Sequence, residues 1–91
     1  MTVTFTKRSR LGVDADGKVA KIDLYVQGVD TAGRTCAKSE TVEYAPADRQ
    51  DKEGFTKEVV TAMIPESWEA EIIAAIEALP PPIVEEEAMD L

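Results

Sequence analysis

The chain has 91 residues, a length that favours one domain and excludes two. It contains no histidine and a single cysteine, Cys36, so an internal disulfide is excluded and the usual catalytic triads and zinc sites lack their residues. We therefore expect a non-enzymatic protein with no cofactor, no metal site and no catalytic residues. The lone thiol and the absence of a signal-peptide pattern near Met1 predict a soluble protein of the cytoplasm or a virion.

Charge is distributed unevenly along the chain, whose net charge is −8. Residues 1–39 carry a small basic excess, whereas residues 40–91 carry 14 acidic and 3 basic groups. No basic residue follows Pro65, although 8 acidic ones do. Such asymmetry is typical of a face or tail that meets a partner, and says little about the fold.

The amino-terminal part predicts β-strands. Val3 and Phe5 alternate with threonines in a run that extends to about Leu11, which is the period of a strand. A clearer alternation follows, in which Ala20, Ile22, Leu24 and Val26 share one face and the residues between them are polar. This pattern predicts a half-buried strand with one wet face.

A third run, from Arg34 to Tyr44, has a weaker apolar face because Lys38 and Glu40 interrupt it, and it predicts an edge strand or a strand that leaves the sheet midway. The three runs are separated by two segments that share a Gly-Val-Asp-x-x-Gly-basic pattern, residues 12–18 and 28–34. Gly17 and Gly33 can adopt positive φ, and the aspartates can accept hydrogen bonds from the turn backbone. The sequence therefore predicts two successive hairpins.

Residues 45–54 form a polar connection, which we interpret as mobile. The next segment, residues 55–64, is ambiguous, because Phe55, Val59 and Met63 fit one face of either a helix or a strand. The β-branched residues 59–61 and the proline at position 65 favour a fourth strand.

An amphipathic helix is predicted from Pro65 to Leu79. Trp68, Ile72, Ile76 and Leu79 recur at helical spacing, with Ala75 in the same stripe. Residues 80–82 are all proline, so the helix must end before them.

These elements define an α+β fold: an antiparallel β-meander of three to four strands, one C-terminal amphipathic helix packed on one face, and an extended acidic tail. Residues 1–79 form the single domain and residues 80–91 a proline-rich acidic tail.

The tail is the candidate partner-binding site. It combines apolar anchors with acidic groups that can steer association. The candidate residues are Ile83, Val84, Glu85, Glu86, Glu87, Met89 and Leu91. The alternative is an inert solvated tail.

Three other patterns carry less weight. Asp14 to Gly17 resembles the start of a calcium loop, but Val19 and Tyr25 occupy positions that need glycine and glutamate, so a plain turn is expected. The helix glutamates, including Glu69 and Glu71, are expected to form a solvated face. The basic residues of the first hairpin suggest ordinary surface charge or an internal partner for the acidic tail, and the net charge argues against nucleic acid as a partner.

We therefore expect a non-enzymatic interaction or assembly protein, such as a small structural or decoration subunit of a viral or other large complex. Its partner is expected to be a protein, bound through the acidic tail or an edge strand, with a homo-oligomer or larger assembly as one form and no membrane involved. The alternative hypothesis is an acidic inhibitor that imitates nucleic acid, using the carboxylates of residues 65–91 to occupy a basic groove on a DNA-handling enzyme.

Overall fold

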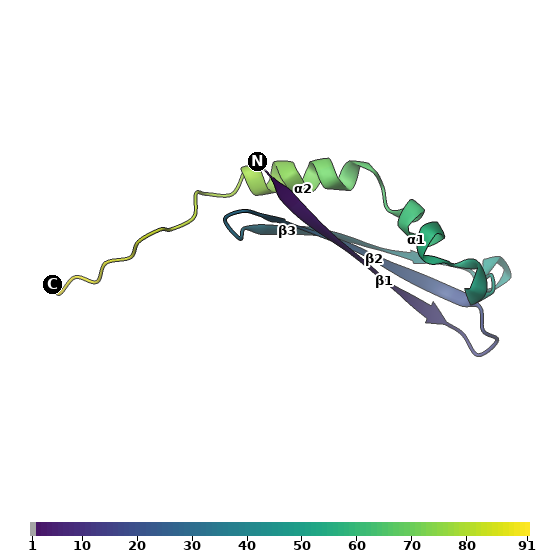
Figure 1. The fold of residues 1–91 in the computed structure, drawn as a ribbon. Coiled ribbons are helices and arrows are strands. Elements are labelled where there is room, and N and C mark those ends of the chain that lie inside the picture. The colour runs from purple at the N-terminus through teal and green to yellow at the C-terminus, as the bar shows by residue number, and fades with distance from the viewer. Residues whose placement is uncertain (1) are drawn as a thin grey trace.

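A computed structural model describes residues 2–91 (Figure 1). Three antiparallel strands, β1 (Val3–Val13), β2 (Val19–Asp30) and β3 (Thr35–Glu43), form a sheet in the order β1-β2-β3. The helices α1 (Lys57–Met63) and α2 (Ser67–Glu77) lie on one face of this sheet, and the other face is uncovered. The α+β class and the three-stranded meander agree with the prediction.

The central strand β2 supplies most of the core. Ile22, Leu24 and Val26 are buried and alternate with partly exposed residues, as the period-two pattern predicts. They join Val19 and the buried residues of the two helices in one apolar cluster. β3 lies at an edge of the sheet, as predicted, and β1 occupies the opposite edge.

Both predicted hairpins are present and use the same turn chemistry. Gly17 and Gly33 have φ values of 77° and 84°, a region that glycine adopts without steric penalty. Asp14 Oδ1 accepts hydrogen bonds from the backbone N–H groups of residues 16 and 18, and Asp30 Oδ1 does the same for residues 32 and 34. The repeated motif is therefore a repeated turn.

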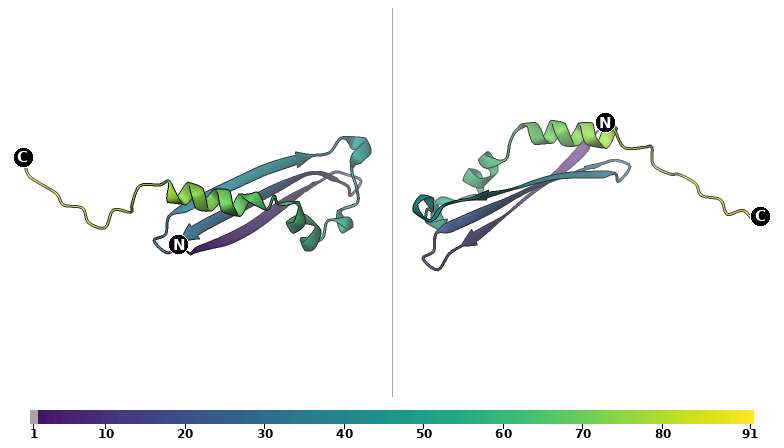
Figure 2. Two further views of the ribbon diagram at one scale, coloured as in Figure 1. Left: turned by 90° about the horizontal axis from the view of Figure 1, so that it is seen from above. Right: turned by 180° about the vertical axis from the view of Figure 1, so that it is seen from behind.

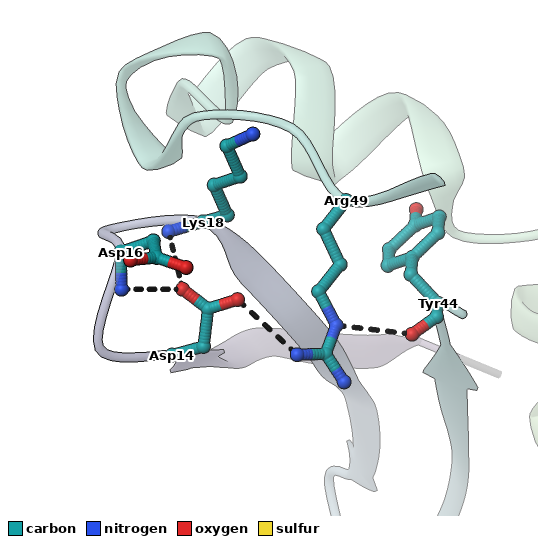
Figure 3. Close-up of polar contacts among 5 residues, drawn as sticks. All are labelled: Asp14, Asp16, Lys18, Tyr44 and Arg49. Atoms are coloured by element: carbon teal, nitrogen blue, oxygen red, sulfur yellow. Dashed lines mark hydrogen bonds and ion pairs between the residues drawn. The ribbon is translucent and has the colours of Figure 1, made fainter. Parts of the chain in front are cut away.

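The connection after β3 is anchored to the first hairpin, contrary to the mobile loop that its composition predicts. It forms two short 3-10 turns, η1 (Pro46–Asp48) and η2 (Lys52–Gly54). Between them, Arg49 donates to Asp14 Oδ2 at 3.2 Å and to the carbonyl oxygen of Tyr44 at 3.2 Å (Figure 3). The N–H of Val19 also donates to the carbonyl oxygen of Gln50.

The predicted fourth strand at residues 55–64 is wrong, because residues 57–63 form α1. Thr56 caps this helix by accepting a hydrogen bond at 3.3 Å from the N–H of Val59. Only Val60 of α1 is buried. Ile64 is extended before Pro65, so the proline correctly excludes a helical residue 64 but does not exclude a helix ending at Met63.

The second helix, α2, is the predicted amphipathic helix with slightly shorter bounds. Trp68, Ile72 and Ile76 are buried in the core cluster. Leu79 lies beyond the last helical residue and is 37% exposed, and Ala75 is exposed, so the buried stripe is narrower than predicted. Helix α2 contacts β2 and β3.

Residues 80–91 form no regular secondary structure and are exposed throughout. They leave the end of α2 and extend away from the sheet, which gives the molecule a longest dimension of 66 Å (Figures 1 and 2). In the part of the chain described, residues 2–91, no helix has the length and apolar character needed to cross a membrane.

Candidate functional site

The candidate tail residues all lie in the projecting segment. Ile83, Val84 and Met89 are 76%, 95% and 79% exposed, and Leu91 is fully exposed. Glu85, Glu86 and Glu87 stand between them, and none of the three forms an ion pair within residues 2–91. The segment therefore offers apolar and acidic groups to a neighbour, and nothing in the described chain covers them.

Two helix glutamates are engaged in the fold instead. Lys7 of β1 and Lys38 of β3 lie opposite Val26 of β2 in one row across the sheet. The Nζ atom of Lys7 is 3.6 Å from a carboxylate oxygen of Glu69, and that of Lys38 is 2.8 Å from one of Glu71. Both glutamates keep about half of their side chains exposed, as expected for a solvated helix face, and in addition they pair with lysines of the two edge strands.

A cleft of about 430 Å³ runs between the free edge of β1 and the segment that contains α1. Leu11, Phe55, Val60 and Ile64 provide its apolar lining. Lys7, Arg8 and Lys57 provide basic groups along the same cleft. In the view from above, α1 lies outside the line of β1 (Figure 2, left). The cleft combines apolar and basic lining residues beside an open strand edge.

The uncovered face of the sheet is polar next to this cleft. Arg8 and Arg10 of β1 lie opposite Tyr25 and Asp23 of β2 in the strand register. These residues line a second, smaller cavity of about 320 Å³. Within the described chain neither arginine has a carboxylate partner within 4.0 Å, so both can pair with acids from outside.

The two turn aspartates, Asp14 and Asp30, have pKa values below the ordinary value of an aspartate. Backbone hydrogen bonding from Lys18 is the largest cause that holds the pKa of Asp14 below its ordinary value of 3.8. Burial acts to raise the pKa of Asp30, but hydrogen bonds from the Arg34 side chain and from backbone N–H groups outweigh it and lower that pKa. Both carboxylates serve turns and have their acceptors occupied.

Other kinds of site find little support among residues 2–91. No three His, Cys, Asp or Glu side chains gather in a geometry that could hold a metal ion. Asp14 Oδ2 is taken by Arg49, in agreement with a plain turn (Figure 3). Cys36 is partly buried against the core, and its pairing position opposite Gly28 places it on the helix-covered face.

Comparison of the chain with protein-family models, with curated proteins and with solved structures gives no match. The fold and the site geometry define a small α+β protein with an exposed acidic and apolar tail and a basic, apolar cleft beside an open strand edge.

Sequence reasoning missed the cleft and the cross-sheet lysine row. The cleft depends on α1, which the sequence misassigns as a strand. The lysine row could have been predicted, because Lys7 and Lys38 each occupy an inward-facing position of an edge strand where an apolar residue is usual. Glu69 and Glu71, on either side of the buried stripe of α2, are the acids that such lysines would be expected to meet.

Proposed function

We propose that this chain is a non-enzymatic interaction protein that binds a protein partner through residues 83–91. The observation that carries this proposal is the exposure of four large apolar side chains, at positions 83, 84, 89 and 91, on a segment whose residues are all exposed. Burying such side chains at an interface releases roughly 25 cal/mol per Å² of apolar surface. The interspersed acids add steering toward a basic partner.

The architecture supports a role in assembly. The helix-covered sheet is a rigid base, and three consecutive prolines hold the tail away from it in an extended conformation. A stiff spacer limits the conformational entropy that the tail loses on binding. A small structural or decoration subunit of a larger complex is the function class that these features fit best.

The nucleic-acid mimic receives less support. That hypothesis needs carboxylates held on a rigid surface and free to bind, yet Glu69 and Glu71 pair with lysines of the sheet. Only Glu66 and Glu77 remain at the two ends of α2, and the other four acids lie on the extended tail. The interaction protein is therefore the function that we propose.

Affinity capture from extracts of the source cells tests the proposal. The bait is the full chain, compared with a variant in which residues 83, 84, 89 and 91 are changed to serine. The matched control is Val59→Ser, which alters an apolar side chain that is 44% exposed on α1. We expect a protein retained by the native chain and by the control but lost from the tail variant. Identical retention by all three baits would contradict the proposal.

A further inference from the structure

We infer that the partner of the tail is a second copy of this chain, whose β1 edge accepts residues 83–91 as an added antiparallel strand. This inference rests on the proposed function and specifies its partner. Within the described residues β1 pairs only with β2, so the backbone N–H and C=O groups along its other side have no strand to bond. An open edge of this kind is a template for an extended segment.

In one antiparallel register, five of the nine residue pairs between the tail and β1 are complementary, either apolar with apolar or acid with base. The other four pairs, among them Val84 with Arg10 and Glu85 with Ser9, are not. The complementary pairs are Ile83 with Leu11, Glu86 with Arg8, Glu87 with Lys7, Met89 with Phe5, and Leu91 with Val3. Glu87 would share Lys7 with Glu69 of α2, whose carboxylate lies 3.6 Å from the same ammonium group. A shift of two residues either way destroys the match, because it places Glu85 opposite Leu11 or Glu87 opposite Phe5.

Side-chain parity agrees with the same register. Val3, Phe5, Lys7 and Leu11 belong to the helix-covered face of the sheet, because they lie opposite inward residues of β2. Ile83, Met89 and Leu91 would share that face in the added strand, since strand residues alternate sides. Ile83 would then lie beside Leu11 in the cleft beneath α1, where Val60 and Ile64 supply apolar surface. Glu86 would lie on the open face beside the unpaired Arg8.

A chain cannot place its own tail in this register. Ile72 of α2 lies over Gly28, which is paired with Phe5, and α2 continues from there toward the Val3 end of the sheet (Figure 1). Leu11 is eight residues farther along β1 than Val3, a span of about 27 Å. Four residues from Leu79 to Ile83 reach about 14 Å at most. The donor must therefore be another copy.

Disulfide trapping between two variants tests the register. Both chains carry Cys36→Ala; one carries Thr4→Cys and the other Asp90→Cys, so any mixed disulfide joins two copies. Paired residues have Cα atoms about 4.5–5.5 Å apart, within disulfide range. The matched control replaces Thr4→Cys by Thr6→Cys, two residues out of register. We expect a several-fold excess of the 4–90 mixed disulfide over the 6–90 one. Equal yields, or none, would overturn the inference.

A third chain tests the competing arrangement. Thr4→Cys and Val84→Cys in one chain would close an internal disulfide only if the tail lay parallel on its own β1. We expect no such closure, and its formation would overturn the inference.

Sedimentation of charge variants supplies a readout that needs no oxidation. Glu86→Lys or Arg8→Glu alone should weaken self-association of the full chain severalfold, and the double variant should regain it, whereas Glu43→Lys on β3 should have no effect. Failure of the rescue would count against the register. If the purified chain shows no tail-dependent self-association while capture from extracts remains tail-dependent, this inference fails and the proposed function stands.

Discussion

Gly28 of the central strand lies directly beneath Ile72 of α2. A Cβ atom added at Gly28 would stand 2.5 Å from Ile72 Cγ2 and 2.9 Å from Val3 Cγ1. The absence of a side chain at this position therefore sets how closely the helix approaches the sheet.

Replacing Gly28 by alanine should destabilise the fold, because α2 must move away to accept the methyl group. Overpacking of this kind costs about 1–3 kcal/mol. The control is Gly54→Ala, where an added Cβ meets no atom within 4 Å and φ is not positive. Urea unfolding followed by tryptophan fluorescence measures both. A Gly28→Ala variant as stable as its control would show that the helix does not rest on this residue.

The same substitution at two isoleucines separates the core from the tail. Ile76 is fully buried, and Ile76→Ala should lower the free energy of unfolding by about 2–5 kcal/mol because it leaves a cavity. Ile83 is 76% exposed, so Ile83→Ala should leave the stability of the dilute monomer unchanged. Thermal unfolding at low protein concentration compares them, and equal effects would contradict the assignment of residue 83 to the tail.

The pairing of Lys38 with Glu71 should make a small, salt-dependent contribution. Both side chains are substantially exposed, and exposed pairs contribute about 0.2–1 kcal/mol. A double-mutant cycle with Lys38→Met and Glu71→Gln measures the coupling. We expect it to fall as salt is raised from low to high concentration. A coupling that is absent at low salt would show that this ion pair does not help to hold α2 on the sheet.

Acid should destabilise the fold through Asp14 and Asp30. Their pKa values are lowered in the folded chain, so below about pH 3.8 the unfolded chain binds protons that the folded chain does not. The stability they contribute is complete above the unfolded pKa and is lost as the pH falls through the folded value. Asp30→Asn should flatten the dependence of unfolding free energy on pH in this range. The control is Glu43→Gln, which removes an exposed carboxylate of β3 that forms no ion pair within residues 2–91, and it should preserve the slope.

Much of the fold follows from local patterns in the sequence. The two hairpins are encoded by aspartate and glycine at fixed positions in the turns, and the alternation at Ile22, Leu24 and Val26 defines the buried face of β2. Trp68, Ile72 and Ile76 define the helix that covers it. Each of these signals is contained within a few residues, so no tertiary information is needed to interpret it.

The segment at residues 55–64 shows where such reasoning fails. Its apolar residues recur every four positions, a spacing that places them on one face of either a helix or a strand. The β-branched residues then favour a strand. Thr56, an N-cap followed by Glu58 in the first turn, is the signal that favours the helix. The cleft beside β1 could not be predicted either, because residues of the α1 segment form one of its walls.

Amide hydrogen exchange along β1 tests the central claim most directly, comparing the full chain with a chain ending at Leu79 over a range of protein concentrations. If the tail of one copy pairs with the edge of another, the outward-facing amides of residues 3–11 should gain protection in the full chain as concentration rises and should exchange freely in the shortened one. Identical exchange in both chains at every concentration would contradict the claim.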